Sequence, residues 1–440
     1  MEHADILVEN ATILTVDLDN TIIQGGSIAV RGDTIIHVGS PAGSEWRAET
    51  KIDAKGGIVL PGLVNAHTHA AMTLFRGLAD DLPLMEWLTD YIFPVEKRMD
   101  ADFVRTGSLL ACAEMILSGT TTFCDMYLFE AETARAAEQA GMRCVVGEVL
   151  YDFDSPSYGD LENGFKTTEA LISDWSGHPL VSVAVEPHSL FTCSPDLLAR
   201  AREIAEAGQV PMAIHLAETE NEVRRIREQY GRLPVEHLAE LGLLGPDLIA
   251  AHCVHLEEHE ISMLAEAGVK VVHNPESNMK LASGVAPVTR LLEAGLTVSL
   301  GTDGCASNNN LDLLCEMDTA AKLHKVHTMD ATALSAETLL RMATIDGAKA
   351  LGLDPVIGSL EPGKKADMII LDIDAPHLTP LYNPASHVVY SASGSDVRCS
   401  IINGRVVMEN RVLLTLALPE ILERVKLRAG DVRTWTSKKV

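Results

Sequence analysis

The middle of the chain alternates short apolar runs of strand length with longer amphipathic segments. Eight apolar runs begin at residues 57, 120, 143, 181, 210, 248, 270 and 297. Helical patterns follow them, for example over residues 195–206 and 256–266. Such alternation is typical of repeated βα units and a parallel sheet. Eight such units predict an α/β protein built on a (β/α)8 TIM-like barrel.

The two ends of the chain carry a different pattern. Residues 5 to about 55 show short alternating strands, and a similar pattern returns after residue 358 in ADMIILDID, HVVYSAS and DVRCSIINGRVVMEN. Both ends together predict one small β-sandwich domain around an inserted barrel. We expect residues 1–57 and 358–420 to form the β-sandwich and residues 58–357 the catalytic barrel. Residues 421–440 would be a C-terminal tail, with a terminal helix packed on the barrel or on a partner.

Charge and cysteine content indicate which binding partners and which cellular location to expect. The chain has 62 acidic and 35 basic residues, a net charge of −27, so we expect no nucleic-acid or membrane partner. The N-terminal sequence MEHADILVEN lacks the basic and apolar regions of an export signal. The eight cysteines form no CxxC pair, so we interpret them as buried, reduced thiols of a cytoplasmic protein. The size of the barrel also leaves room for a homo-oligomer.

Histidines and acidic residues stand where several of the apolar runs end. In a (β/α)8 barrel these ends converge on one mouth, so distant residues can share a site. His67 and His69 are one residue apart on a strand, so both rings point to the same face. Taken alone, this pair is equally well explained as two metal ligands or as two polar residues at a strand end. His215 and Asp303 end two further runs, and this favours metal ligands. Three histidines and one aspartate suit one zinc ion per subunit with room for water, and they also suit iron or manganese.

A second metal ion would need a bridging ligand. The fourth run, VSVAVEPHS, holds no lysine that could serve as one. The third run offers Glu148 as a conceivable bridge, but an ion pair is the commoner fate of such a glutamate. The pattern therefore favours a site with one metal.

Two further residues fit proton transfer near that metal. Glu218 lies three residues after His215 in HLAE, where its carboxylate can act as general acid and base beside a water on the metal. The alternative is a glutamate favoured by the N-terminus of a helix. His252, at the end of the sixth run, can stabilise the charge that develops on the attacking oxygen. We expect structural roles for His255 and His259, as neighbours on a helix face, and a strand-end role for His273.

The order of motifs along nearly the whole chain resembles the amidohydrolase superfamily, and within it the branch of 5-methylthioadenosine and S-adenosylhomocysteine deaminases. The motifs are PGLVNAHTHAAMTLFRGLADDLPLMEWL, FPVEKRM, EPHS, HLAETENEV, AHCVHL, HNPESNMKLASGVAP and GTDGCASNN. The resemblance implies that the metal ligands are His67, His69, His215 and Asp303. It implies that the proton-transfer residues are Glu218, His252 and Asp303. It also implies substrate contacts by Glu96 at the ribose hydroxyls, by His188 at the nucleoside, and by Trp87 and Ser307 nearby.

The residues alone would not have indicated two of these contacts. Without the resemblance, Glu96 is a surface glutamate paired with Lys97 or Arg98, and Trp87 is ordinary hydrophobic core. Some relatives place an arginine after the third strand to meet the carboxylate of S-adenosylhomocysteine. The corresponding segment here, GEVLYDF, contains none, so the homocysteine end of that substrate has no assigned partner.

The activity implied is the hydrolytic deamination of an adenosine-type nucleoside by a zinc-activated water, which gives the inosine analogue and ammonia. The substrates would be 5'-methylthioadenosine, S-adenosylhomocysteine or adenosine itself. One alternative uses the same site as a deaminase or dechlorinase of a free base or triazine, but a free base offers no ribose to Glu96. Another is a non-catalytic scaffold that keeps the metal as structure, although every position that an open catalytic site needs is filled.

Overall fold

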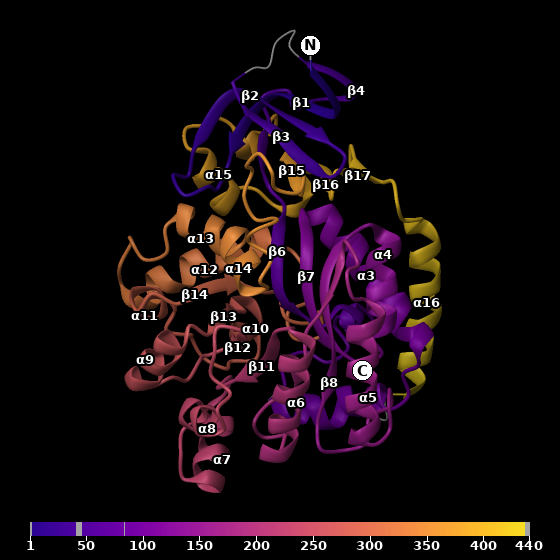
Figure 1. The fold of residues 1–440 in the computed structure, drawn as a ribbon, viewed down its shortest axis with the longest axis vertical. Helices are drawn as coiled ribbons and strands as arrows, with labels where there is room; N and C mark the ends of the chain where they lie inside the picture. The colour runs from indigo at the N-terminus through magenta and orange to yellow at the C-terminus, as the bar shows by residue number, and fades with distance from the viewer. Residues whose placement is uncertain (1, 41–45, 83, 436–440) are drawn as a thin grey trace.

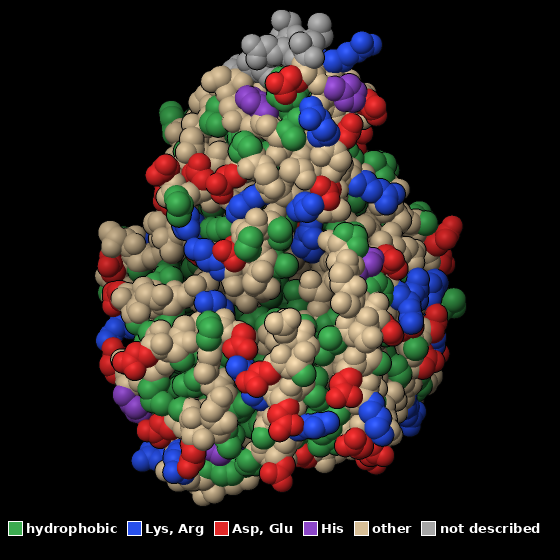
Figure 2. Space-filling view, in the orientation of Figure 1, with side chains coloured by type: hydrophobic (Ala, Val, Ile, Leu, Met, Phe, Trp, Pro, Cys, Tyr) green, Lys and Arg blue, Asp and Glu red, His purple; other side chains and the backbone are tan. Residues whose placement is uncertain are grey.

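The computed structural model describes residues 2–40, 46–82 and 84–435. A β-sheet occupies the upper end in Figure 1, and an α/β barrel lies below it. Acidic and basic side chains are interspersed over the face drawn in Figure 2. No helix in the described ranges is both long and apolar enough to cross a membrane. Seven of the eight cysteines are buried, and Cys315 is half-buried.

Strands from both ends of the chain form one hydrogen-bonded sheet of nine strands. Its N-terminal strands are β1 (Glu2–Leu14), β2 (Ile22–Arg31), β3 (Thr34–Gly39), β4 (Trp46–Asp53) and β5 (Ile58–Pro61). Its C-terminal strands are β15 (Met368–Leu371), β16 (Val397–Ile402), β17 (Arg405–Glu409) and β18 (Val412–Leu413). The order is β18-β17-β16-β15-β5-β1-β2-β3, with β4 paired to β1. The two ends meet where β5 runs antiparallel to β15.

The first apolar run, from residue 57, is divided between the two parts of the molecule. Its first half is β5 of the sheet, and its second half is β6 (Leu63–Thr68), the first barrel strand. The prediction of one continuous barrel strand was therefore wrong. Gly62 stands at the break, where a Cβ atom would lie 2.0 Å from Oγ1 of Thr121. Only glycine permits this close approach between the two parts.

The eight apolar runs supply the eight strand positions of the barrel. After β6 come β7 (Thr120–Tyr127), β8 (Arg143–Leu150), the short pair β9 (Val181–Val183) and β10 (Glu186–Pro187), β11 (Met212–Leu216), β12 (Leu248–His252), β13 (Lys270–His273) and β14 (Thr297–Leu300). Neighbours pair in parallel. A bridge between Val185 and Met212 joins the two groups of strands. On the other side, the Asp303 amide donates to the His67 carbonyl over 3.0 Å.

Helices follow the strands and cover the barrel (Figure 1). They include α3 (Ala101–Ser118), α4 (Glu130–Ala140), α5 (Leu161–Asp174), α6 (Pro195–Gly208), α7 (Glu220–Tyr230), α9 (Glu258–Ala267) and α12 (Leu313–Thr328). Side-chain caps fix several starts, since Asp100, Asp160 and Ser194 each accept a hydrogen bond from a backbone amide three residues on. Short helical turns α1 (Leu84–Trp87), η3 (Leu88–Ile92) and α2 (Phe93–Glu96) precede α3.

The segment HVVYSAS, predicted as a strand, lies mostly in a helix. It belongs to α15 (Pro384–Tyr390), so this prediction was wrong. The Asn383 side chain caps the helix by accepting from the Ser386 amide, and Pro384 occupies its first turn. Ala385, Val388 and Val389 are buried together. Their spacing of three and four residues is helical, but the adjacent Val388 and Val389 resemble a strand equally well.

The C-terminal helix α16 (Leu418–Trp435) packs on the barrel helix α3, as expected for the tail (Figure 1). It starts before residue 421, because Leu418 already belongs to it. Arg424 binds Asp102 over 2.7 Å, and the rings of Trp435 and Phe103 lie 5.5 Å apart. Residues 436–440 lie outside the described residues.

Candidate active site

A cavity of about 370 Å³ opens at the C-terminal ends of the barrel strands. Nine of the ten residues predicted for the site line it: His69, Trp87, Glu96, His188, His215, Glu218, His252, Asp303 and Ser307. The tenth, His67, lies beneath them, with its ring 4.9 Å from that of His69. Residues separated by more than two hundred positions thus meet at one barrel mouth.

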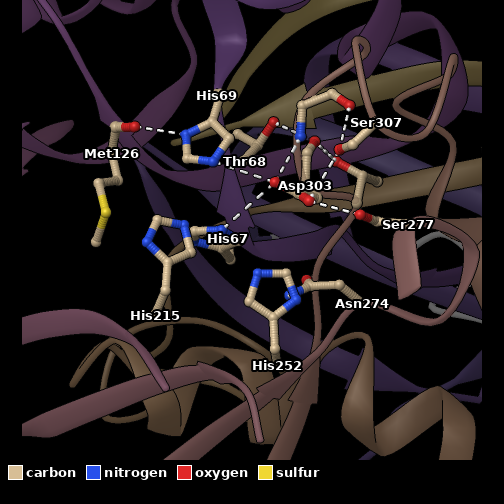
Figure 3. A network of polar contacts seen from close by, with 12 residues as sticks. His67, Thr68, His69, Met126, His215, His252, Asn274, Ser277, Asp303 and Ser307 are labelled. Atoms are coloured by element: carbon tan, nitrogen blue, oxygen red, sulfur yellow. Dashed lines mark hydrogen bonds and ion pairs between the residues drawn. The ribbon is translucent and has the colours of Figure 1, made fainter. Parts of the chain in front are cut away.

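Three histidines and an aspartate converge at the floor of this cavity (Figure 3). The ring of His67 lies 4.9 Å from that of His215, and His215 lies 5.4 Å from His69. Oδ1 of Asp303 is 3.1 Å from Nε2 of His69 and 3.6 Å from Nε2 of His67. The candidate ligand atoms of His67, His69 and Asp303 all lie within 4.8 Å of one another. The ligand atoms of His67, His215 and His252 form a second such set, so a cation beside His67 can contact ligands from either set.

Hydrogen bonds outside the cluster orient these side chains. Nδ1 of His69 pairs with the Met126 carbonyl over 2.5 Å, and Nδ1 of His215 pairs with the His188 carbonyl over 2.8 Å. Because Nδ1 carries the proton in each pair, Nε2 is left as a donor of electrons to a metal. Nε2 of His67 is buried without a hydrogen-bond partner among the described residues.

The aspartate is oriented in the same way. Oδ2 of Asp303 accepts hydrogen bonds from Ser277 over 2.6 Å and from Ser307 over 2.9 Å, which leaves Oδ1 directed at the histidines. Ser307 lines the cavity, and its hydroxyl lies within hydrogen-bond distance of both Asp303 and the Gly304 carbonyl. Three imidazole nitrogens and one carboxylate oxygen in a buried cluster fit a zinc ion.

The electrostatics of the cluster agree with that fit. Burial lowers the pKa of His67 to about 4 and that of His215 well below its usual value, so both rings are neutral. Burial opposes ionisation of Asp303, but the adjacent rings of His67 and His69 outweigh it and hold the pKa of Asp303 well below its usual range. Burial likewise opposes the charge on His69, yet Asp303 raises its pKa to about 9. The buried carboxylate thus requires a positive charge beside it, which a proton or a metal cation provides.

Glu218 and His252 lie beside this cluster. Nε2 of His252 is 4.0 Å from Oε2 of Glu218, and the Ser283 hydroxyl donates to Oε1 of Glu218 over 3.4 Å. The side-chain amide of Asn278 donates to Nδ1 of His252 over 3.0 Å, with Asn274 at 3.3 Å. Nδ1 is then an acceptor, and Nε2–H is directed toward Glu218. Burial raises the pKa of Glu218, as a proton-transfer group requires.

A glutamate that the sequence analysis passed over holds Glu218 in place. Strand β11 leaves the barrel through Ala217, which has a φ of +50°. The Glu222 carboxylate accepts from the amides of Ala217 over 3.0 Å and of Glu218 over 2.9 Å. The sequence does carry a signal for it, because Thr219 and Glu222 have the spacing of a capping box, and Thr219 accepts from the Glu222 amide.

Comparison with known proteins decides the family. The amidohydrolase family model matches residues 58–407. The chain belongs to the amidohydrolase family. It is 58% identical over 434 residues to the 5-methylthioadenosine/S-adenosylhomocysteine deaminase of Syntrophobacter fumaroxidans, covering 98% of this chain and 99% of the relative. It is 48% identical over 431 residues to the 5'-deoxyadenosine deaminase of Methanosarcina mazei, covering 98% of each.

A solved structure of the same architecture contains a metal. An adenosine deaminase from Xanthomonas campestris with bound zinc superimposes with a TM-score of 0.97 at 38% identity. The alignment covers 98% of this chain and 99% of the other. The expected α/β fold, a barrel with a small β-sandwich domain built from both chain ends, is therefore confirmed, and the strands of that domain form one hydrogen-bonded sheet.

The wall of the amidohydrolase cavity carries the predicted nucleoside contacts. The Tyr127 hydroxyl donates to Oε1 of Glu96 over 2.7 Å, so Glu96 faces the cavity and pairs with neither Lys97 nor Arg98. Nδ1 of His188 lies 3.0 Å from the hydroxyls of both Ser189 and Thr192. Burial lowers the pKa of His188 to about 3, which keeps the ring neutral.

Other polar residues of this amidohydrolase lie away from the metal cluster. Glu148 neither bridges nor forms an ion pair; it is buried and accepts from the amides of Phe129 and Glu130 at the start of α4. His255 precedes α9 and pairs with the Ser283 carbonyl over 2.6 Å, so the expected helix-face pair with His259 was wrong. His273 pairs with His324 at 3.0 Å.

Proposed function

We propose that the chain is a metal-dependent hydrolase that deaminates adenosine-type nucleosides to the inosine analogues and ammonia. The proposal rests on one observation: the histidine and aspartate cluster, two proton-transfer groups and Glu96 line a single cavity. A metal cluster alone fits many hydrolases. A carboxylate in the wall, which can accept two vicinal hydroxyls, adds recognition of a ribose. The similarity to deaminases of 5-methylthioadenosine and 5'-deoxyadenosine supports this reading.

The proposed metal ligands are His67, His69, His215 and Asp303. A zinc ion bound there would supply Lewis-acid activation of water near neutral pH. The same residue types also bind iron or manganese. We propose one metal ion per subunit.

The residues around the reacting atoms divide the proton transfers between them. Glu218 takes a proton from the attacking water and delivers it to N1 of adenine while the new C6–O bond forms. Nε2–H of His252 hydrogen-bonds the attacking oxygen and stabilises its charge. Asp303 then accepts the second proton of that oxygen. The C6–N bond breaks, and ammonia leaves with this proton. The proton on N1 stays in the inosine-type product.

The remaining contacts position the nucleoside. Glu96, already held by Tyr127, accepts hydrogen bonds from the ribose hydroxyls, and His188 hydrogen-bonds the nucleoside. Trp87 is buried in the cavity wall and packs against the bound substrate. We propose that the enzyme works in the cytoplasm, which the buried thiols support, and without nucleic acid, which the net charge of −27 supports.

The decisive experiment measures ammonia release and the ultraviolet change from zinc-loaded protein with each candidate substrate separately. The panel is 5'-methylthioadenosine, S-adenosylhomocysteine, 5'-deoxyadenosine, adenosine, guanine, cytosine and a chloro-s-triazine. We expect turnover of the adenosine compounds alone. Turnover of only a free base or the triazine would contradict the roles of Glu96 and His188, and no turnover of any compound would contradict the deaminase assignment.

A further inference from the structure

The cavity has an unpaired cation at its rim. Among the described residues that line it, Arg225 of α7 is the one arginine or lysine. Its side chain is exposed, and among the described residues the guanidinium contacts the Phe191 ring and no carboxylate. The four acidic residues of the lining are engaged elsewhere: Glu96 with Tyr127, Glu218 with Ser283, Glu222 with backbone amides, and Asp303 with the histidines. The guanidinium is therefore available to an anionic ligand.

The wall between the metal cluster and Arg225 is continuous. The ring of His188 lies 4.8 Å from that of His215, and Phe191 lies 5.9 Å from His188. The Arg225 guanidinium carbon lies 5.4 Å from the centre of the Phe191 ring. A guanidinium that stacks on an aromatic ring contacts the ring through its flat face, so its N–H groups stay available to bind a carboxylate. The cavity thus runs from the proposed nucleoside contact at His188 to a cation at the rim.

The candidate substrates differ at their 5' substituent. A methylthio or methyl group needs only an apolar surface to pack against. The stacked rings of Tyr151 and Phe153, whose centres lie 3.9 Å apart, provide such a surface in the cavity wall. A homocysteine tail adds a carboxylate, which needs a cation. We propose, on the basis of the proposed function, that Arg225 binds the carboxylate of the 5' amino-acid tail and selects S-adenosylhomocysteine as a substrate. The segment after β8 lacks an arginine, and α7 supplies one instead.

The test compares kcat and KM of wild type and Arg225→Gln on three nucleosides. These are S-adenosylhomocysteine, 5'-methylthioadenosine and 5'-deoxy-5'-(3-aminopropylthio)adenosine, which is the homocysteine compound without its carboxylate. The substitution should lower kcat/KM for S-adenosylhomocysteine about tenfold, mainly through KM, because a charged hydrogen-bonded pair is lost. The other two nucleosides should change by less than about twofold. Added salt should raise the wild-type KM for S-adenosylhomocysteine only.

Arg224→Gln is the matched control. Arg224 is the neighbouring arginine of the same helix, is exposed, and does not line this cavity. It should leave all three substrates unchanged. Equal effects of Arg225→Gln on substrates with and without the carboxylate would overturn the proposal, as would a wild type that uses 5'-methylthioadenosine but not S-adenosylhomocysteine. Both results leave the deaminase function intact. Failure to release ammonia from any adenosine compound would overturn the function and the proposal together.

Discussion

The Tyr127 hydroxyl donates a hydrogen bond of 2.7 Å to the Glu96 carboxylate. The two residues reach the cavity from different elements, Tyr127 from the end of β7 and Glu96 from α2. The bond holds one carboxylate oxygen and leaves the other free for a substrate. It also ties the short helical turns before α3 to the barrel, so the proposed ribose contact is preformed.

Replacing Glu96 should therefore weaken nucleoside binding more than it slows the chemical step. We expect Glu96→Gln to lower kcat/KM for adenosine compounds roughly 10- to 100-fold, mainly through KM, because charge-assisted hydrogen bonds to the ribose hydroxyls are lost. The measurement is steady-state deamination of 5'-deoxyadenosine and of 2',3'-dideoxyadenosine. The dideoxy compound offers no vicinal hydroxyls, so its kcat/KM should stay nearly constant. An equal loss for both compounds would contradict a ribose contact.

The pH dependence follows from two buried glutamates. Burial raises the pKa of both Glu96 and Glu218 above the usual 4.5. Each must be ionised in the free enzyme, Glu96 to accept hydroxyl protons and Glu218 to take a proton from water. Activity is therefore full at higher pH and is lost as pH falls through the raised pKa values, earlier than an ordinary glutamate would allow.

The measurement is log kcat/KM against pH for 5'-deoxyadenosine. The acid limb should approach a slope of about two in the wild type and about one in Glu96→Gln, because one of the two ionisations is removed. An identical slope in both proteins would show that Glu96 does not titrate in the active range.

Metal removal gives an independent check of the cluster. Chelation should abolish deamination, and zinc should restore it. Elemental analysis of the purified enzyme should find about one metal ion per chain, with His215→Ala well below that. The control is His377→Ala, a half-exposed histidine outside the cluster that pairs with Asp396. The metal should also raise the unfolding temperature, since a ligand that binds only the folded state stabilises it. Full activity after complete chelation would rule out the proposed metal role.

The sequence allowed us to predict the strand-end residues of the site, but not the residues that hold them in position. His67, His215 and Asp303 could be placed together because strand ends of a barrel share one mouth, which is a property of topology. Glu96 could not, because it comes from a short helical turn before α3 and only the resemblance indicated it. Tyr127 was missed because its role is a hydrogen bond to Glu96 across two elements, and residue order does not encode such a contact. Glu222 was missed although its capping-box spacing with Thr219 is visible in the sequence, because that spacing indicates a helix start and not the bonds to the amides of Ala217 and Glu218.

The errors in the fold have local causes. The break at Gly62 was hidden because apolar residues stand on both sides of it, and the turn signal of Pro61-Gly62 was not taken as the end of a strand. In HVVYSAS, helix α15 was hidden because two adjacent valines match a strand as well as a helix face. The capping residue Asn383 and Pro384 lie upstream of the segment that was considered.

The contact between the barrel and the sheet domain provides a prediction about stability. Arg143, the first residue of β8, and Asp367, just before β15, form a buried ion pair. Nε and NH2 of Arg143 donate to the two carboxylate oxygens over 2.9 Å and 3.3 Å. The backbone amide of Asn403 also donates to Asp367, over 2.6 Å, and the Pro179 carbonyl accepts from Arg143 over 2.8 Å. Hydrogen bonds thus reach all three guanidinium nitrogens and both carboxylate oxygens of the pair.

Asp367→Asn should lower the free energy of unfolding by about 3–5 kcal/mol, because it leaves the Arg143 charge buried without its counter-ion. Neither residue lines the cavity, so kcat at low temperature should be unchanged.

Thermal and urea unfolding measure the loss of stability. The control is Glu423→Gln, because Glu423 and its partner Lys426 are about 70% exposed. Such exposed pairs contribute roughly 0–1 kcal/mol. The double variant Arg143→Met/Asp367→Leu removes both charges and should recover most of the stability. If Asp367→Asn costs no more than Glu423→Gln, the buried ion pair contributes no more to stability than an exposed one, which contradicts the prediction.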